Sequence, residues 1–238
     1  MKPNAERNRS RIPKERPDFP PPLTPKPGAD GSLPHESPES LFRVVQAHYL
    51  RQDRRLGVYA VTGAGEFVPS SLENVRRGLA NLMDEGILRS SHTFLDAGSG
   101  DGRVVILVSL VFGLKTCGVE YDDALWRRSL DNVAFFRPFY RPGNALPAVL
   151  CGDFCEEETY TRHGTAFRNF DVVFNYANDH HRLAAKIARD GAEQVLFLCY
   201  GPIPFPESFP GLVTIRSLTL GNGAAQRGSF LHVYRKGG

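Results

Sequence analysis

The sequence has few cysteines and no pattern that predicts a metal centre. Only four of its 238 residues are cysteines. Two of them have C-x3-C spacing, but neither a second cysteine pair nor nearby histidines accompany them, and a structural zinc site needs one or the other. We therefore expect no metal, and reduced, mostly buried thiols. The four residues are Cys117, Cys151, Cys155 and Cys199.

Long apolar runs and a secretory leader are also missing. The longest apolar stretch, residues 104–114, is interrupted by Ser109 and Gly113, and it is much shorter than the ~20 residues that a membrane-spanning helix needs. No apolar segment follows the charged residues 1–11, so they do not form a secretory signal. These absences predict a cytoplasmic protein with no membrane partner.

An excess of charge of one sign is absent as well. The formal net charge is only +3, and residues 1–38 hold seven basic and five acidic side chains, so the remainder is almost neutral. A dedicated nucleic-acid surface carries a stronger basic excess, so nucleic acid is not an expected partner. A local basic patch is expected, if anywhere, at Arg51, Arg54, Arg55, Arg76 and Arg77.

Composition divides the chain into three parts. Residues 1–38 contain ten of the eighteen prolines and predict a disordered tail. Residues 39–91 show apolar positions at helical spacing and predict an N-terminal helical lid. Residues 92–238 alternate between strand-like and helix-like segments and predict the main domain.

Two helices are expected in the lid. The first spans residues 40–51 and is capped by Ser37 or Ser40. The second opens on a predicted capping box, in which Ser70 is the N-cap and Glu73 lies three residues further on.

The rest of the chain predicts a doubly wound α/β sheet, because strands and helices alternate. The last two strands are joined by a glycine-rich turn and predict an antiparallel hairpin. The expected strands cover residues 93–97, 116–120, 147–151, 171–176, 194–200, 212–220 and 230–235, and the expected helices cover 102–114, 123–136, 156–168 and 179–190.

The most informative segment is Phe-Leu-Asp-Ala-Gly-Ser-Gly-Asp-Gly, residues 94–102. It predicts a strand that runs into a glycine-rich turn and then a helix, an arrangement that cradles an adenine-nucleoside cofactor. The dinucleotide pattern wants its third glycine at position 103, where this chain has Arg103. The sequence therefore disfavours an NAD-dependent oxidoreductase.

Four motifs in order resemble the class I S-adenosylmethionine-dependent methyltransferases. The first is Asp96 to Gly102, the second is Glu120 at the end of the next strand, the third is Gly152-Asp153-Phe154, and the fourth is Asp171 to Asn175. The resemblance covers residues 92–200. It implies a Rossmann-like, seven-stranded, mostly parallel sheet closed by a C-terminal antiparallel hairpin, and S-adenosylmethionine as the cofactor.

The resemblance also assigns cofactor-binding residues. The loop around Asp96 would hold the methionine end, Glu120 would accept from the ribose hydroxyls, and Tyr121 would pack near the adenine. Asp101 is expected either to face solvent or to cap the following helix. The full set of expected cofactor-binding residues is Asp96, Gly98, Ser99, Gly100, Gly102, Glu120, Tyr121, Asp153, Phe154 and Asn175.

Acceptor chemistry is expected in the segment after the fourth motif. Asn175 and Tyr176 would orient an amine, and His180 or His181 would remove a proton near neutral pH. In the alternative interpretation, Asp179 caps the next helix and both histidines are solvated. Base-methylating DNA enzymes need an Asn-Pro-Pro-Tyr turn, which this segment lacks, so base methylation is disfavoured.

The acceptor itself stays open. Gly65-Glu66-Phe67, Gly152-Asp153-Phe154 and Phe174-Asn175-Tyr176 are similar to segments of the non-SET protein-lysine methyltransferases, although the doubled asparagine of that branch is absent. A small-molecule acceptor is an equal alternative, and RNA is a weaker one. A catalytically inactive subunit that recruits partners through the proline-rich tail is a further alternative. Candidate walls of the acceptor pocket are Tyr49, Tyr59 and Phe67.

Overall fold

The computed structural model describes residues 37–57, 59–62, 65–141, 145–176, 178–221 and 228–237. Residues 35–238 form one compact unit. Apart from its last two residues, the expected tail of residues 1–38 lies outside the described residues, and the prediction of disorder there stays a prediction.

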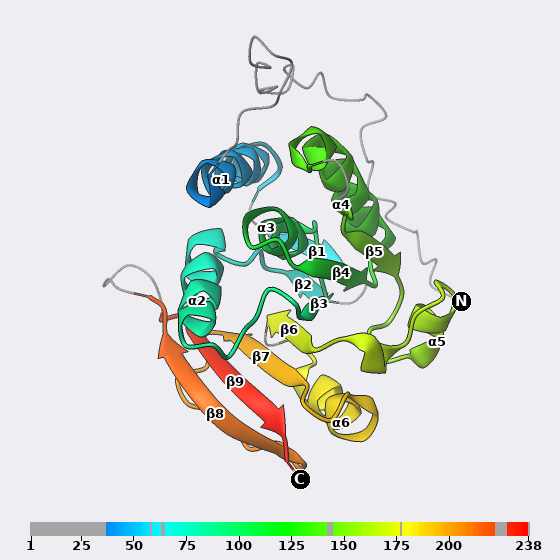
Figure 1. Ribbon diagram of the computed structural model, residues 1–238. Helices are drawn as coiled ribbons and strands as arrows, with labels where there is room; N and C mark the ends of the chain where they lie inside the picture. Colours follow the sequence, from blue (N-terminus) through cyan, green and yellow to red (C-terminus); the bar gives the residue numbers. More distant parts are fainter. Residues whose placement is uncertain are drawn as a thin grey trace, which may run out of the picture. The chain divides into compact units, whose positions relative to one another are not determined.

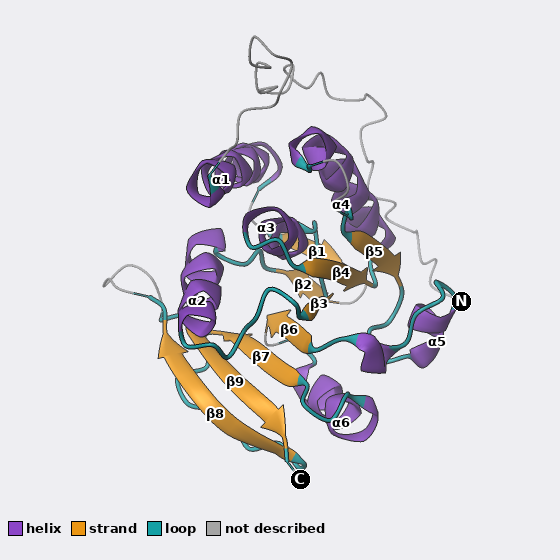
Figure 2. Ribbon diagram, in the orientation of Figure 1, coloured by secondary structure: helices purple, strands orange, loops and turns teal. Residues whose placement is uncertain are grey.

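A seven-stranded sheet forms the centre of this unit, in the order β5-β4-β3-β6-β7-β9-β8 (Figures 1 and 2). The first five strands in this order run parallel, and β9 and β8 close the sheet as an antiparallel hairpin. The expected fold class is confirmed. The strands are β1 (Ala60–Thr62), β2 (Gly65–Phe67), β3 (Thr93–Ala97), β4 (Lys115–Glu120), β5 (Ala148–Cys151), β6 (Val172–Tyr176), β7 (Leu196–Gly201), β8 (Leu212–Thr219) and β9 (Phe230–Lys236). The α-helices are α1 (Pro38–Leu56), α2 (Leu72–Asp84), α3 (Arg103–Val111), α4 (Asp123–Phe136), α5 (Glu157–Thr161) and α6 (His180–Asp190), with 3₁₀ turns at Arg137–Phe139 and Phe167–Asn169.

The strand order places a switch point beside β3. From β3 the chain crosses to β4 on one side, and the later strand β6 pairs with β3 on the other side. Ligands of doubly wound sheets bind outside the carboxyl ends of the strands at such a point. The fold therefore directs attention to the segments that follow β3, β4 and β6.

Alternate residues of the central strands pack into two apolar layers, one on each face of the sheet. On β3, Phe94 packs on the side of α1, α2 and α3, whereas Leu95 and Ala97 pack on the side of α5 and α6. This alternation follows from the two-residue period of a strand. Because β3 is buried on both faces, it is apolar along its length except for Thr93 at its start and Asp96 near its end.

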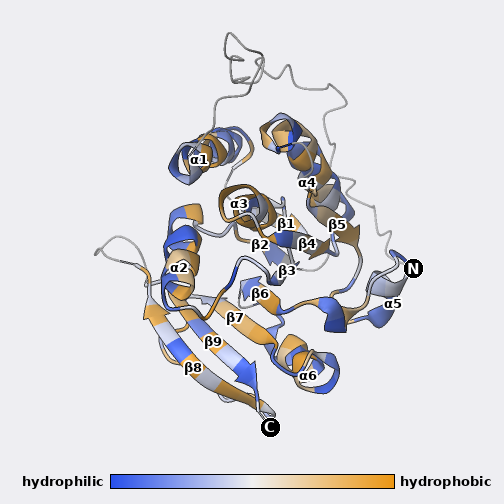
Figure 3. Cartoon of the chain, in the orientation of Figure 1, coloured by the Kyte–Doolittle hydropathy of each residue, from blue (hydrophilic) through white to orange (hydrophobic). Residues whose placement is uncertain are grey.

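Helix α3 explains why the N-terminal helices are needed. Its residues from Val104 to Leu110 are all buried, and Figure 3 shows it as hydrophobic around its circumference. A helix without a polar face must be covered on its outer side as well as against the sheet. Helices α1 and α2 supply this cover and share one apolar core with α3. The role of residues 39–91 as a lid stays a prediction.

Two predicted helix boundaries need correction. The expected helix over residues 156–168 is only five residues long, because Gly164 has a left-handed φ of 69° just beyond its end. At α2, the N-cap is Ser71 rather than Ser70, and its hydroxyl accepts from the backbone N–H of Asn74 at 3.4 Å. Glu73 is thus one position too early for a capping box.

At α1, the structure selects between the two predicted caps. The hydroxyl of Ser37 accepts from the backbone N–H of Ser40 at 3.1 Å, and Pro38 opens the helix.

None of the helices in the described ranges combines the length with the apolar character that crossing a lipid bilayer requires. None of the four cysteines, all of which lie in the described ranges, forms a disulfide. Cys117 and Cys199 are buried, whereas Cys151 is exposed and Cys155 is partly buried.

Replacing Ser71 by alanine should lower the free energy of unfolding by about 1 kcal/mol, because a backbone donor of α2 loses its capping oxygen. Ser70→Ala is the matched control and should change stability less. Urea unfolding followed by circular dichroism measures both variants. A larger loss of stability in Ser70→Ala than in Ser71→Ala would identify Ser70 as the cap.

Candidate active site

A cavity of about 630 Å³ lies at the carboxyl ends of the parallel strands. Its walls come from the loop after β3, the ends of β4 and β6, the segment after β5, and the β1–β2 hairpin with its continuation to α2. The residues that line it are Thr62, Glu66, Phe67, Val68, Ser70, Asp96, Gly98, Ser99, Gly100, Asp101, Arg103, Val104, Glu120, Tyr121, Leu125, Asp153, Phe154, Phe174, Asn175, Tyr176, Asn178, Asp179 and Arg182.

The glycine-rich loop after β3 is anchored to β4. The backbone N–H groups of Gly98 and Ser99 both donate to the carbonyl of Val119 at 2.9 Å. Gly98 has φ of 84°, and a Cβ there would make only ordinary contacts, at 3.8 Å with the ring of Phe154 and at 3.9 Å with the amide nitrogen of Asn175, so the backbone is not crowded at this point. A ligand can therefore approach the backbone at Gly98.

The other two glycines of the loop are required by packing. Gly100 has φ of 55°, and a Cβ would lie 2.3 Å from the ring of Phe67. Gly102 is the N-cap of α3, and its Cβ would lie 3.0 Å from Ser129 on α4. Gly102 does not line the cavity, so its predicted place among the cofactor-binding residues is not supported by its position.

Ser99 occupies a niche left by another glycine. A Cβ at Gly118 of β4 would lie 2.7 Å from the hydroxyl oxygen of Ser99. This oxygen is buried and has no hydrogen-bond partner among the described residues. The small size of Ser99 and the absence of a side chain at Gly118 together let the loop lie close to the sheet.

Glu120 ties the loop to the end of β4. One carboxylate oxygen accepts from the backbone N–H of Gly100 at 2.7 Å, and the other accepts from that of Asp122 at 2.8 Å. Burial raises the pKa of Glu120, and these two hydrogen bonds oppose the rise. Each oxygen keeps lone-pair capacity for a further donor.

Asp96 at the end of β3 is the most strongly perturbed acid of the cavity. Its side chain is buried, and burial, followed by the nearby carboxylates of Glu120 and Asp101, holds its pKa well above the usual range. None of the described residues donates a hydrogen bond to its carboxylate. A cation bound in the cavity would relieve this repulsion.

Asp101 was expected either to face solvent or to cap the following helix, but its main contact is an ion pair. Its carboxylate is buried and accepts from the guanidinium of Arg103 at 3.0 and 2.7 Å. Arg103 also donates to Asp53 of α1 at 2.8 and 3.2 Å, and lies over the ring of Tyr49 at 4.8 Å. The Arg103 that replaces the third dinucleotide glycine thus connects α1 to the loop. A weak capping contact from Asp101 to the N–H of Arg103, at 3.3 Å, is secondary.

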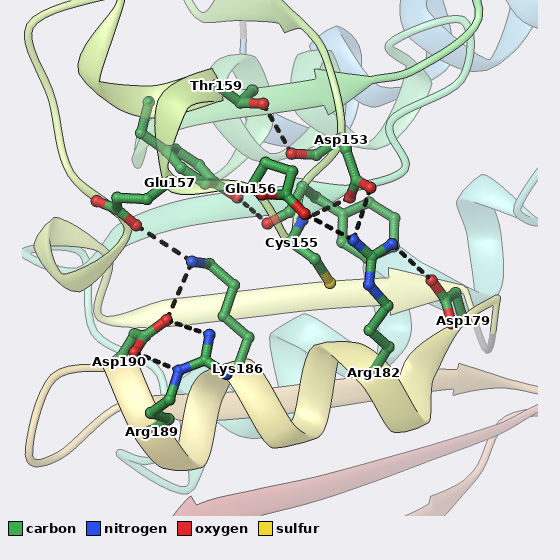
Figure 4. Close-up of polar contacts among 12 residues, drawn as sticks. Asp153, Cys155, Glu156, Glu157, Thr159, Asp179, Arg182, Lys186, Arg189 and Asp190 are labelled. Atoms are coloured by element: carbon green, nitrogen blue, oxygen red, sulfur yellow. Dashed lines mark hydrogen bonds and ion pairs between the residues drawn. The ribbon is translucent and has the colours of Figure 1, made fainter.

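Asp153, one of the expected cofactor-binding residues, binds a residue that the sequence analysis did not single out. Figure 4 shows the guanidinium of Arg182, on α6, between Asp153, Glu156 and Asp179. It donates to Asp153 at 2.8 Å, to Glu156 at 3.1 Å and to Asp179 at 3.3 Å. Only the i,i+3 spacing from Asp179 was visible in the sequence. Arg182 connects the segment after β5 to the segment after β6.

Phe154 and Tyr121 both line the cavity, as predicted. Tyr121 is exposed, while Phe154 is partly buried and lies nearest to the open side of Gly98. Below them, the buried ammonium of Lys186 pairs with Glu157 and Asp190, which fixes α6 under the segment after β5 (Figure 4).

Asn175 and Tyr176 reach the cavity in different ways. The buried amide of Asn175 donates to the carbonyl of Ala97 at 2.7 Å, and its oxygen accepts from the backbone N–H of Asn178 at 3.0 Å. It therefore positions the ends of β3 and β6. Tyr176 is partly buried and packs edge-on against Tyr200 at 5.3 Å, and burial raises its pKa.

The two histidines are not brought into the cavity. His180 lies 2.5 Å from a carboxylate oxygen of Glu207, and neither His180 nor His181 lines the cavity. Asp179 occupies the N-cap position of α6 but makes no capping hydrogen bond with its side chain. His180 as a general base stays a prediction that this placement does not support.

Of the three predicted aromatic walls, Phe67 lines the cavity. Tyr49 is buried in the core, where its hydroxyl donates to the carbonyl of Asp101 at 3.3 Å. Tyr59 is 72% exposed and is not among the lining residues.

Comparisons with known proteins agree with this geometry. The model of the family "Histone methylation protein DOT1" matches residues 69–145, which include the glycine-rich loop and Glu120. No curated protein sequence matches the chain.

Among solved structures, the rRNA methyltransferase aviRa from Streptomyces viridochromogenes is similar to this chain, with 12% identity, 71% of this chain and 86% of that chain covered, and a TM-score of 0.56. An RNA methyltransferase from Salinibacter ruber, solved with S-adenosyl-L-homocysteine, has 15% identity, covers 71% and 94% of the two chains, and has a TM-score of 0.50. A putative transferase from Pyrococcus horikoshii has 12% identity, 83% coverage of both chains and a TM-score of 0.50.

The chain therefore has the fold of class I methyltransferases, and the resemblance read from its motifs is confirmed at this level. Because solved structures of this fold include RNA methyltransferases, the fold does not exclude nucleic acid as a partner.

Asp96→Asn should raise the free energy of unfolding of the ligand-free protein at neutral pH, because the folded state disfavours the ionised carboxylate. An acid whose folded-state pKa is raised destabilises the fold above that pKa. The cost disappears as the pH falls toward the unfolded value of about 3.9. The difference between variant and wild type should therefore shrink as the pH is lowered.

Urea unfolding over this pH range tests the point, with the exposed Asp131→Asn as control. A destabilised Asp96→Asn protein at neutral pH would contradict the assignment of repulsion at this site.

Gly100→Ala should lower the free energy of unfolding by about 1–3 kcal/mol, because it adds backbone strain and a collision with Phe67. Gly113→Ala is a matched control, since Gly113 has φ of 71° with nothing within 4 Å of a Cβ, and it should show the strain alone. Phe67→Ala should cost less stability in the Gly100→Ala protein than in wild type. Simple additivity in this double-mutant cycle would rule out the contact.

Proposed function

We propose that this protein is an S-adenosylmethionine-dependent methyltransferase. The observation that carries the proposal is the cavity beside the glycine-rich loop, into which Asp96 at the end of β3 and Glu120 at the end of β4 both open. The DOT1 family match and the S-adenosyl-L-homocysteine complex of the Salinibacter enzyme support it.

The residues of the cavity fit this cofactor. The backbone at Gly98 is not crowded, since a Cβ there would meet nothing closer than 3.8 Å, and Phe154 offers a flat apolar wall beside it. The cofactor carries an ammonium and a sulfonium. Either cation would stabilise the carboxylate of Asp96, to which none of the described residues donates a hydrogen bond. Glu120 has acceptor capacity for ribose hydroxyls. Asp153 and Tyr121 also line the cavity, and we assign them to the adenine end of the cofactor.

When bound, the cofactor supplies a methyl group on a good leaving group. The chain then has little acid–base chemistry to perform, and its residues act by positioning and by excluding water. Asn175 holds the end of β6 against the loop, and Tyr176, which is partly buried, also lines the cavity. Phe67 closes the side formed by the β1–β2 hairpin.

We further propose an amine acceptor, with protein lysine as the first class to test. Carboxylates outnumber guanidinium groups among the described residues that line the cavity. Such a lining attracts a cationic side chain and repels a phosphate backbone. The printed description of the DOT1 family, histone methylation, points to a protein acceptor as well. The acids are Glu66, Asp96, Asp101, Glu120, Asp153 and Asp179, and the bases are Arg103 and Arg182.

The first test is thermal unfolding with S-adenosylmethionine, S-adenosylhomocysteine and NAD. The two adenosyl ligands should raise the melting temperature, since a ligand that binds only the folded state stabilises it, and NAD should not. Glu120→Ala should abolish the shift, whereas Glu158→Ala, which removes an exposed acid outside the cavity, should retain it. No shift with either adenosyl ligand would overturn the proposal.

Transfer of a labelled methyl group to histones, to lysine-free histone variants and to ribosomal RNA identifies the acceptor class. Label on wild-type histones alone supports the amine proposal. Label on RNA alone overturns it while leaving the methyltransferase assignment intact.

A further inference from the structure

A second cluster of chemically capable side chains lies outside the cavity. His180 and His181, at the start of α6, face Glu207, which belongs to the segment between β7 and β8. The Nε2 atom of His180 is 2.5 Å from one carboxylate oxygen of Glu207, and the Nε2 atom of His181 is 3.5 Å from the other. All three ligand atoms lie within 4.8 Å of one another.

The rings of the two histidines lie side by side, with centroids 4.5 Å apart. Consecutive residues of a helix point about 100° apart and do not normally share a partner. The chain enters α6 through Asp179 in a left-handed conformation, with φ of 52°, and Asp179 is the only described residue other than glycine with a positive φ. Strain of this kind persists only where the surroundings hold it, and it concentrates at functional sites.

Phe209 and Tyr234 hold the histidines and Glu207 in place. The ring of Phe209 lies edge-on to both imidazoles, at 6.0 and 5.3 Å, and is itself buried. The backbone N–H of Glu207 donates to the hydroxyl of Tyr234 on β9 at 3.0 Å. Glu207 is therefore held by the closing hairpin, and the histidines are held by an apolar wall.

We propose that His180, His181 and Glu207 form a binding site for a divalent transition metal, with Zn²⁺ as the expected ion. Two imidazole nitrogens and a carboxylate suit zinc, whereas Mg²⁺ and Ca²⁺ prefer oxygen ligands alone. Zinc bonds of about 2.0–2.1 Å place tetrahedral ligand atoms roughly 3.3 Å apart. The distance of 3.5 Å between His181 and Glu207 fits this value, and the 2.5 Å contact between His180 and Glu207 would lengthen on binding. On binding, the metal replaces the hydrogen bond between His180 and Glu207, and the proton of that bond passes to solvent.

The side chain of His181 is 67% exposed, so the fourth coordination position faces water. The ion would join the start of α6 to the segment that carries Glu207. Asn178 and Asp179, which directly precede the histidines, line the cavity. The metal would thus brace the acceptor side of the cavity from outside. This inference does not depend on the proposed methyl transfer, because its test measures the ion alone.

Calorimetric titration of the full, chelator-treated chain with Zn²⁺ and Mg²⁺ tests the site. We expect one Zn²⁺ per chain and no binding of Mg²⁺. His181→Ala and Glu207→Gln should each weaken Zn²⁺ at least tenfold, and because His181 is exposed its removal should leave folding intact. His163→Ala is the matched control, an exposed histidine elsewhere, and should bind as wild type does.

Unchanged Zn²⁺ affinity in both ligand variants would overturn the proposal. Co²⁺ provides a second readout, since its visible spectrum reports nitrogen and oxygen ligands. A thiolate charge-transfer band that disappears in Cys151→Ser would place the ion on the exposed cysteine instead and would also overturn it.

Discussion

The loop that shapes the cavity depends on one buried ion cluster, Asp53–Arg103–Asp101. The guanidinium of Arg103 forms salt bridges with two carboxylates, one from α1 and one from the loop itself. The carbonyl of Asp101 in turn accepts from Tyr49 and from the amide of Asn132 on α4. Removing one member of such a buried pair leaves an uncompensated charge, which is strongly destabilising. Helix α1 therefore holds the loop at Arg103 and Asp101, and α4 holds it at Asp101.

The same cluster explains the charge of the cavity. Because Arg103 is committed to Asp53 and Asp101, it does not neutralise Asp96, whose pKa is raised by burial and by neighbouring acids. Acids without a cationic partner destabilise the ligand-free fold. A cation that binds in the cavity removes this destabilisation. The fold thereby favours a positively charged ligand over an anionic one.

The sequence predicted most of the sheet, since the two-residue and 3.6-residue periods and the glycine-rich loop are local signals. It also placed Asp96, Glu120, Phe154 and Asn175 at the cavity. It missed Arg182 and Glu207, because their contacts with Asp153 and His180 join segments 29 and 27 residues apart. It put a histidine at the acceptor side because adjacency in sequence does not show that His180 and His181 face Glu207 and do not line the cavity. Those contacts depend on tertiary packing, which local patterns do not contain.

The central claim is that the acid-lined cavity beside Gly98 binds the adenosyl cofactor. A crystal structure of the protein with S-adenosylhomocysteine tests it most directly. The account predicts the ligand between Gly98 and Phe154, with its amino group at Asp96 and its ribose hydroxyls at Glu120. A ligand bound elsewhere on the chain, or one whose ribose and amino group contact neither acid, would contradict it.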